Sequence, residues 1–275
     1  MKRNDPPAWL AHLLLLTTAL VFATPLAWML LTSVKPLEQI TADPHRVLPS
    51  QWRFANYVEA VTTIPYFRYL QNSLVLCAGT VLGTLWSSAL AAYAFARLKW
   101  PGRDSLFLVL VATMLLPWHV TMIPRFLLIR ELGLYNTLSA LVVPSFLGDA
   151  FSIFLLRQFF LTIPAELGEA ARLDGCTDWG IFWRIVVPLS RPALATVALF
   201  QFIASWNDFN GPLIYLNDPS RFTLAYGLEQ FVSAYSTQTN LLMAAAVLFA
   251  LPIVILFFLT QRTFLRGIAT TGLKS

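Results

Sequence analysis

The chain has 275 residues, of which 57% are hydrophobic and 12% are charged, and its formal net charge is +5. Because soluble domains carry about 25% charged residues, this composition excludes an ordinary soluble globule and favours a membrane protein. The basic residues stand singly between apolar runs, which argues against a nucleic-acid-binding face. Cys77, Cys176 and the three histidines show no disulfide or metal-ligand spacing, so we expect free thiols and no metal site.

Six apolar segments approach or exceed the ~20 residues that a helix needs to cross a bilayer. The first is longer than the ~7–15-residue core of a signal peptide, so we expect it to be a retained span. A span must satisfy its own backbone hydrogen bonds in lipid, so each segment is expected to be a helix, with local kinks at Pro25, Pro144 and Pro252. The sequence predicts an all-α polytopic membrane protein in which residues 1–275 form one domain, with spans at 10–34, 70–95, 105–123, 138–159, 192–215 and 241–260.

The distribution of basic residues predicts the orientation of these spans. With both termini in the cytoplasm, the external loops lie at about 35–69, 124–137 and 216–240. We expect a short helix near 54–61 and a turn at 217–220 in these loops. Twelve of the 19 Lys and Arg residues are then cytoplasmic: Lys2, Arg3, Arg97, Lys99, Arg103, Arg157, Arg172, Arg184, Arg191, Arg262, Arg266 and Lys274.

Residues 162–190, which we call the signature loop, form a polar and helix-prone stretch between two predicted spans. Pro164 suits a first helical turn, and the residues after it are mostly strong helix formers. Gly175 fits the left-handed position that ends a helix. Asp178 is expected to cap a second short helix, which Pro188 would end. The predicted loop is therefore a helix, a sharp turn and a second helix.

The first helix of this loop has the side chains of a protein-docking element. Glu166, Glu169 and Asp174 offer carboxylates to basic groups, and Ala170 and Ala171 would let another surface approach the backbone closely. The alternative is an amphipathic helix that lies on the membrane surface. Such helices are usually rich in Lys and Arg, whereas this one has a single arginine. We therefore favour docking of a soluble partner.

The stretch Glu169-Ala170-Ala171-x-x-Asp174-Gly175, followed by Ile185-x-Val187-Pro188, resembles the EAA signature of permease subunits in bacterial ABC importers. Val187 stands where that family usually has Leu. The resemblance covers nearly the whole chain, and the residues 270–275 depart from the family's common ending. Several stretches are similar to the second permease of carbohydrate importers of the maltose and glycerol-3-phosphate type, namely Met122-Ile123-Pro124, Leu132-Gly133-Leu134-Tyr135-Asn136-Thr137, Ile163-Pro164 and Trp206-Asn207-Asp208-Phe209.

The resemblance implies a type I ABC importer permease in the bacterial cytoplasmic (inner) membrane. Its partners would be two ATP-binding cassette subunits, a second and different permease subunit, and an extracytoplasmic solute-binding protein. ATP and Mg would belong to the partner subunits, because this chain has no Gly-x-x-x-x-Gly-Lys-Ser/Thr loop and no nucleophile–base pair. We expect no cofactor and no catalytic residue here. The residues expected to couple transport to ATP hydrolysis are Glu166, Glu169, Ala170, Ala171, Asp174, Gly175, Ile185 and Pro188.

Polar residues inside the predicted spans are candidates for the solute pathway, because a carboxylate within a membrane is expensive. The candidates are Asp149, Trp206, Asn207 and Asp208. Amide and carboxylate groups hydrogen-bond sugar hydroxyls, and an indole ring stacks on a sugar face. The alternative is that these groups pair with a neighbouring helix or cap a broken span.

The leading interpretation is a transmembrane subunit that forms half of the pathway for a sugar or sugar-like solute. A stand-alone secondary transporter or channel is the alternative, and it would leave the signature loop unexplained. A membrane enzyme would need a catalytic cluster that the sequence does not show.

Overall fold

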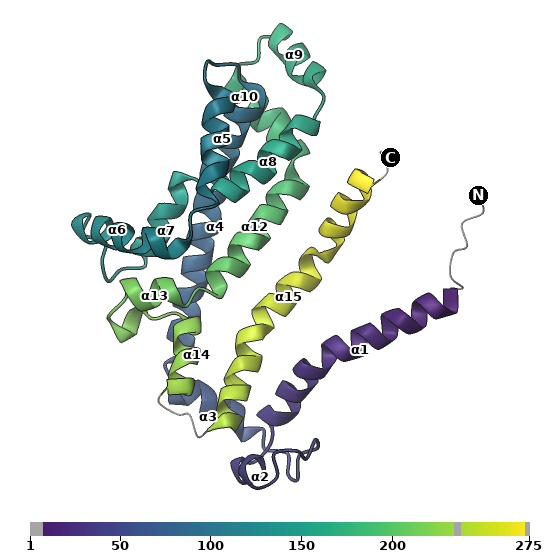
Figure 1. Cartoon of the computed structure of the whole chain (residues 1–275), viewed down its shortest axis with the longest axis vertical. Helices are drawn as coiled ribbons and strands as arrows, with labels where there is room; N and C mark the ends of the chain where they lie inside the picture. The colour runs from purple at the N-terminus through teal and green to yellow at the C-terminus, as the bar shows by residue number, and fades with distance from the viewer. Residues whose placement is uncertain (1–7, 234–237, 273–275) are drawn as a thin grey trace. The chain divides into compact units, whose positions relative to one another are not determined.

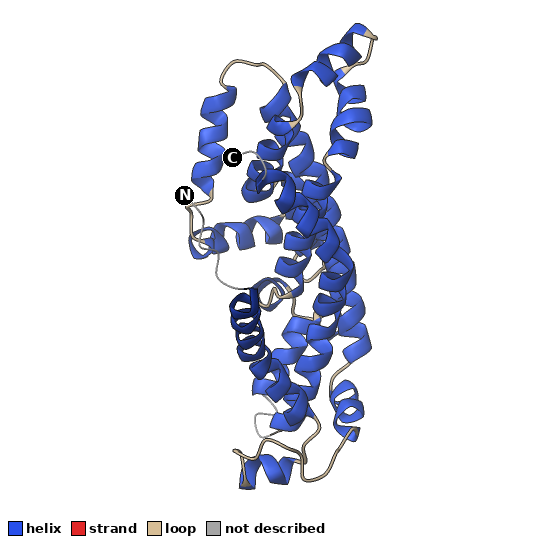
Figure 2. Ribbon diagram, turned by 90° about the vertical axis from the view of Figure 1, so that its right-hand side faces the viewer, coloured by secondary structure: helices blue, strands red, loops and turns tan. Residues whose placement is uncertain are grey.

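The computed structural model describes residues 8–233 and 238–272, and every regular element among them is helical (Figure 2). The all-α prediction is therefore confirmed for this part of the chain. Lys2, Arg3 and Lys274, which contributed to the predicted cytoplasmic charge, lie outside the described residues, as does the end of the divergent tail. The chain divides into two compact units, residues 1–66 with 227–252 and residues 67–226 with 253–275.

The first unit is held together by a buried asparagine. Asn56 has no exposed surface, and its Nδ2 donates to the carbonyls of Ser33 and Lys35 at 2.9 Å each. Its Oδ1 accepts from Asn240 Nδ2 at 3.0 Å. These bonds join α3 to the end of α1 and the start of α15. The helices of the unit are α1 (Ala8–Ser33), α2 (Leu37–Ala42), α3 (Ala55–Thr63), most of α14 (Leu224–Ser233) and the first part of α15 (Thr239–Gly272).

Nearly all of α4 belongs to the second unit (Figure 1), where it packs against further helices through a buried apolar cluster. Ala92 of α4, Leu156 and Phe160 of α8, and Val197 of α12 are almost completely buried in this cluster. The elements in chain order are α4 (Tyr66–Arg97), α5 (Arg103–Thr113), α6 (Trp118–Glu131), α7 (Ser139–Val142), the 3-10 helix η1 (Val143–Leu147), α8 (Ala150–Thr162), α9 (Ala165–Leu173), α10 (Asp178–Ile181), the π-helical turn η2 (Phe182–Val186), α11 (Val187–Leu189), α12 (Arg191–Trp206), α13 (Asn210–Tyr215) and the 3-10 helix η3 (Pro219–Arg221).

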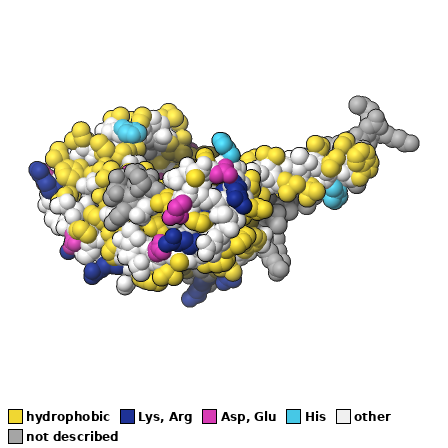
Figure 3. Space-filling view, turned by 90° about the horizontal axis from the view of Figure 1, so that it is seen from below, with side chains coloured by type: hydrophobic (Ala, Val, Ile, Leu, Met, Phe, Trp, Pro, Cys, Tyr) yellow, Lys and Arg dark blue, Asp and Glu magenta, His cyan; other side chains and the backbone are white. Residues whose placement is uncertain are grey.

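Among the described residues, four helical segments are long and apolar enough to cross a membrane. Two bent helix pairs raise the number to six if each pair is one span, namely Arg103–Thr113 with Trp118–Glu131 and Asp178–Leu189 with Arg191–Trp206. Large apolar side chains cover much of the visible surface in Figure 3, as helices in contact with lipid require. The four segments are Trp9–Ser33, Tyr66–Arg97, Ser139–Thr162 and Thr239–Gln261, and they match four of the predicted spans.

The predicted span 105–123 is bent into two helices. α5 ends at Thr113, α6 begins at Trp118, and the two meet at 99°. The predicted external loop 124–137 is helical over its first half, because α6 continues to Glu131. Pro117 marks the bend: a proline disfavours the helical conformation of the residue before it and suits the start of the next helix. The apolar character of the sequence continues across this bend and concealed it.

The predicted span 192–215 is also broken. α12 ends at Trp206 and α13 begins at Asn210. Asn207 Nδ2 donates to the Ile203 carbonyl at 2.8 Å, so this side chain competes with the helical backbone for its hydrogen bonds. The predicted turn at 217–220 is confirmed by η3, whereas α14 occupies part of the predicted loop 216–240.

Candidate functional site

The first helix of the signature loop, α9, has a start signal and a stop signal in its own flanking residues. Pro164 precedes α9 in an extended conformation. At the other end, Gly175 adopts φ 81°, its N–H donates to the Arg172 carbonyl at 3.0 Å, and the Cys176 N–H donates to the Ala171 carbonyl at 2.8 Å. This pair of bonds is the Schellman motif, which needs a left-handed residue that glycine supplies without strain. The predicted helix and its stop are confirmed.

The second helix of the loop departs from the prediction in two ways. Thr177, and not Asp178, is the N-cap: its Oγ1 accepts from the Gly180 N–H at 3.3 Å. Pro188 does not end the helix, which continues through η2 and α11 to Leu189. The π-helical turn adds a residue to the helical repeat just before the proline, so the chain remains helical across a position where proline usually stops an α-helix.

The two faces of α9 differ in what they contact. Gly168 and Ala171 lie on the inner face, where Ala171 packs against the apolar cluster of the unit. The outer face presents Glu166, Glu169 and Ala170, which are all exposed. The loop therefore separates the two alanines that the sequence suggested would receive a partner together: only Ala170 is on the open face.

The end of α9 projects a large apolar side chain into solvent. Leu173 is 91% exposed, and Asp174 beside it is exposed as well. Arg172 joins α9 to α10 through an ion pair with Asp178, with 2.6 Å between Nη2 and Oδ1. Of the remaining predicted loop residues, Ile185 packs against the apolar cluster and Pro188 is exposed.

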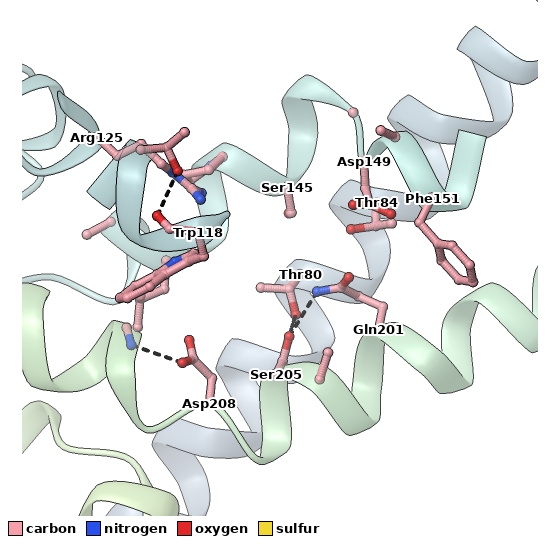
Figure 4. Close-up of a pocket in the computed structure, with 18 of the residues that line it drawn as sticks. Thr80, Thr84, Trp118, Arg125, Ser145, Asp149, Phe151, Gln201, Ser205 and Asp208 are labelled. Carbon is pink, nitrogen blue, oxygen red and sulfur yellow. Dashed lines mark hydrogen bonds between the residues drawn. The ribbon is translucent and has the colours of Figure 1, made fainter. Parts of the chain in front are cut away.

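A second candidate site is a cavity of about 860 Å³ within the second unit, which we call the central cavity (Figure 4). Its wall is formed where helices bend or break: the α5–α6 bend, the η1–α8 junction and the α12–α13 break, together with one face of α4. Ser205 joins two sides of the wall, because its Oγ lies 2.8 Å from Thr80 Oγ1 and accepts from Gln201 Nε2 at 3.0 Å. Hydroxyl, amide, carboxylate and guanidinium groups all reach this space.

The cavity contains two of the predicted pathway residues, Asp149 and Asp208. Each carboxylate also accepts a backbone hydrogen bond at the start of a helix. Asp149 Oδ2 accepts from the Ser152 N–H at 2.8 Å and caps α8. Asp208 Oδ1 accepts from the Gly211 N–H at 2.9 Å at the start of α13. The interpretation that these acids cap broken spans therefore holds alongside their position in the cavity wall.

The other two predicted pathway residues do not line this cavity. Trp206 is 1% exposed, and its ring stacks on Phe202 with centroids 5.6 Å apart. Asn207 is exposed, and its amide is engaged with the turn of α12 that precedes it. Trp206 therefore belongs to the packed interior of the unit, and the Asn207 side chain bonds the end of α12.

Sequence reasoning missed several residues of the cavity wall. Thr80 and Thr84 of α4 and Arg125 of α6 line it. For α4 a signal was present: polar residues recur at intervals of seven and four residues along it, which places them on one helix face. These residues are Ser73, Thr80, Thr84 and Ser88. Arg125 gave no such signal, because its place depends on the unpredicted bend before α6.

Comparison with known proteins identifies the chain. Residues 79–270 match the family described as binding-protein-dependent transport system inner membrane component. The chain is 33% identical to the arabinooligosaccharides transport system permease protein AraQ of Halalkalibacterium halodurans over the full length of both. It is 34% identical to the sn-glycerol-3-phosphate transport system permease protein UgpE of Agrobacterium fabrum, covering 98% of this chain and 99% of the relative.

A solved structure agrees with this result. The chain is 26% identical to a chain from the crystal structure of a bacterial ABC transporter involved in the import of the acidic polysaccharide alginate. The match has a TM-score of 0.81 and covers 93% of this chain and 95% of the other. The family match and the permease relatives, together with the apolar helices, define the chain as a membrane permease. The chain belongs to the family of inner membrane components of binding-protein-dependent transport systems.

Proposed function

We propose that this chain forms half of the translocation pathway of an ATP-driven importer for a sugar or sugar-like solute. The relatives support this cargo, because their names specify arabinooligosaccharides and sn-glycerol-3-phosphate, and the similar structure belongs to an importer of alginate. The central cavity supports it as well. Its hydroxyl, amide and carboxylate groups are the donors and acceptors that bind the hydroxyls of a sugar.

The partners in this proposal are two ATP-binding cassette subunits, which bind ATP and Mg, a second and different permease subunit, and an extracytoplasmic solute-binding protein. The observation that carries the proposal is the outer face of α9. It places Leu173, 91% exposed, beside the exposed carboxylates of Glu169 and Asp174. An exposed apolar anchor with a charged rim suits a pocket on a protein partner.

The orientation in this proposal puts both termini and the signature loop in the cytoplasm, as the positive-inside rule predicts. ATP-driven closure of the partner subunits then moves α9 and switches the pathway between inward-facing and outward-facing states. A short helix closed by a Schellman motif and packed on its inner face moves as one body. The loop is therefore suited to transmit a displacement rather than to absorb it.

The docking role is tested by Glu169→Lys and Gly175→Leu in the complete complex, reconstituted in proteoliposomes with its binding protein. Glu169→Lys reverses the charge of the docking face, and Gly175→Leu forces a bulky side chain into φ 81°. We expect solute uptake and binding-protein-stimulated ATP hydrolysis both to fall at least about 10-fold, since a 10-fold loss corresponds to ~1.4 kcal/mol of docking energy. Normal uptake and normal stimulated hydrolysis in both variants would refute the proposal.

Two control variants separate docking from general damage. Gly102→Leu introduces the same backbone strain at φ 83°, with open space around it, outside the signature loop. Glu131→Lys makes the same charge reversal at the exposed end of α6. Both controls should keep stimulated hydrolysis close to the wild-type value. The cargo is then identified by screening the binding protein, purified with the complex, against neutral oligosaccharides, sugar phosphates and acidic glycans.

A further inference from the structure

α4 makes side-chain contacts with the backbone on both sides of the first helix of the signature loop. Arg97, the last residue of α4, donates to the Phe160 carbonyl at 2.6 Å and also to the Ile163 carbonyl. Both carbonyls lie where the chain leaves α8 and enters the loop. Tyr93 Oη donates to the carbonyl of Asp178 at 3.1 Å, where the chain enters α10. α9 therefore lies between two segments that α4 holds.

The middle of α4 holds the wall of the central cavity by contacts of the same kind. Ser87 Oγ donates to the Ser145 carbonyl of η1 at 2.9 Å. Ser88 Oγ accepts from the N–H of Asp149 at 3.4 Å, beside the cap of α8. Together with the pairing of Thr80 and Ser205, these bonds fix η1, the start of α8 and α12 relative to α4.

Close packing adds to these bonds. A Cβ on Gly79 would lie 2.9 Å from a Val142 methyl, and a Cβ on Gly83 would lie 2.2 Å from Ser145 Oγ. Only glycine permits this approach between α4 and the α7–η1 segment. A displacement of α4 would therefore carry this part of the cavity wall with it, because there is no free space between them.

The first part of α4 holds a third region, the segment around η3. Asn72 Nδ2 donates to the carbonyls of Ser220 and Phe222 at 3.0 and 2.9 Å. Ser73 Oγ accepts from the Leu224 N–H at 2.8 Å. At 1.5 Å per residue, Asn72 and Arg97 are separated by ~38 Å along the helix, and Thr80 and Arg97 by ~26 Å. One helix thus contacts the loop, the cavity and a segment at the far end of the unit.

We propose that α4 transmits movement of the signature loop to the central cavity, and that Arg97 and Tyr93 are the positioning residues that attach the loop to it. This inference rests on the proposed docking function of the loop. α4 is suited to this task because it contains no proline and is helical throughout Tyr66–Arg97. Loss of the attachment would let the loop follow the ATP-binding subunits while the cavity wall stays in place.

A purely structural role for Arg97 makes a different prediction. A cationic side chain at the end of α8 also stabilises that helix by bonding its last carbonyls. If stabilisation were the whole role, its loss would lower the amount of folded complex, and uptake and ATP hydrolysis would fall together. If the attachment transmits movement, ATP hydrolysis per assembled complex would persist while uptake is lost.

The experiment measures solute uptake, ATP hydrolysis and the amount of assembled complex in proteoliposomes that contain the full transporter and its binding protein. The variants are Arg97→Gln, Tyr93→Phe and the double variant, with Arg97→Lys as the conservative change. Tyr93→Phe removes only a hydroxyl, so it tests the attachment even if Arg97→Gln fails to fold. Arg103→Gln is the matched control, because its bonds to the Leu98 carbonyl and to Asp104 stay outside the signature loop.

We expect the number of ATP molecules hydrolysed per solute transported to rise about 10-fold in Arg97→Gln, the effect of losing a hydrogen bond to a charged group, and about 3-fold in Tyr93→Phe. Arg97→Lys should recover part of the loss, since an ammonium can still donate to one carbonyl. The ratio in Arg103→Gln should stay at the wild-type value. An unchanged ratio in Tyr93→Phe and Arg97→Gln, or a parallel fall of uptake, hydrolysis and complex amount, would overturn the inference.

A cross-link separates failure of this inference from failure of the proposed function. Glu166→Cys in a Cys176→Ser background carries a photo-reactive maleimide on the exposed first turn of α9, which leaves Leu173 in place, and is assayed for cross-linking to the ATP-binding subunit. If no cross-link forms without further substitutions, the docking function itself is refuted. If the cross-link forms, persists in Arg97→Gln and the ATP-to-solute ratio rises, the loop docks normally and α4 is the attachment.

Discussion

The signature loop and the central cavity are assembled in different ways. The bonds that cap the loop's helices lie within residues 162–190, namely the Schellman motif at Gly175 and the cap by Thr177. The cavity brings together residues from Leu76 to Tyr215, and its shape depends on breaks in three apolar segments. The loop is a local structure that another protein can contact, whereas the cavity exists only when distant segments are packed against one another.

This difference separates the effects expected from mutations in the two regions. In the loop, a change should alter docking or coupling while the membrane unit stays folded. In the cavity wall, most changes should alter packing first, because the same residues that face the cavity also hold helix breaks in place. Asp149 and Asp208 illustrate this, since both carboxylates line the cavity and accept backbone hydrogen bonds.

The largest effect is expected for Gly83→Leu, which tests the packing of the cavity wall. A Cβ at this position would already lie 2.2 Å from Ser145 Oγ and 2.7 Å from the ring of Phe146. The helices would have to separate, at a cost of ~3 kcal/mol or more for overpacking of this kind. We expect little assembled complex by size-exclusion chromatography and no measurable solute uptake.

Gly168→Ala is the matched control in the signature loop. The nearest atom to its added Cβ is an Ile181 methyl at 4.0 Å, an ordinary contact. In a helix interior this change adds ~0.5–1 kcal/mol of stability, so assembly and uptake should be retained. A Gly83→Leu complex that assembles and transports at the wild-type level would show that the distinction between the two regions does not hold in the working protein.

An intermediate effect is expected at the two carboxylates of the cavity, where it distinguishes capping from contact with the solute. Asp149→Ala and Asp208→Ala each remove a bond to the start of a helix, which costs ~0.5–2 kcal/mol. The asparagine variants keep a carbonyl oxygen that can accept the same bond. If capping is the main role, thermal stability and uptake should fall in the alanine variants and remain close to wild type in the asparagine variants.

The opposite result is equally informative. If Asp208→Asn keeps its thermal unfolding temperature but raises the solute concentration needed for half-maximal uptake as much as Asp208→Ala does, then the carboxylate charge contacts the solute. In that case the cavity would differ from the loop in chemistry as well as in assembly, and capping would be a secondary role of this residue.

Sequence reasoning succeeded where the signals are local. Pro164 and Gly175 delimit α9 as predicted, because a proline at a helix start and a glycine at its stop act through their own backbone conformations. It failed at Pro188, because a π-helical turn in the preceding residues keeps the chain helical there. A proline therefore predicts the end of a helix only where the residues before it form a regular α-helix.

The cavity was harder to predict because tertiary packing decides it. Asp149 and Asp208 were identified as unusual from their place in apolar segments, but apolar sequence resumes after the break beside each of them, so the segments were predicted as continuous spans. Thr80 and Ser205 are separated by most of the unit's sequence, and nothing in either segment alone indicates that they meet. Trp206 was predicted to line the solute pathway because an indole ring can stack on a sugar. In the structure its ring stacks on Phe202.

The smallest effect is expected for the ion pair between Arg172 and Asp178, which tests how the loop keeps its shape. The pair is short, 2.6 Å, but about half of each side chain is exposed. Exposed pairs contribute ~0.2–1 kcal/mol, and salt at ~0.15 M already screens charges beyond ~8 Å. The hydrogen bond that Arg172 donates to Asp178 raises the pKa of Arg172 above its ordinary value. The guanidinium therefore stays charged, and the pair should respond to salt and not to mildly alkaline pH.

We therefore expect Arg172→Gln to reduce binding-protein-stimulated ATP hydrolysis by less than about 5-fold at low salt, in line with the contribution of an exposed pair. The reduction should shrink as salt rises, because the wild-type pair then contributes less. The Schellman bonds and the inner face of α9 remain intact in this variant, so protease resistance of the loop should be unchanged. A large loss of stimulated ATP hydrolysis that persists at high salt would contradict this prediction. It would mean that the charge of Arg172, and not the backbone motif at Gly175, determines the geometry of the loop. The loop would then lose its main contrast with the cavity.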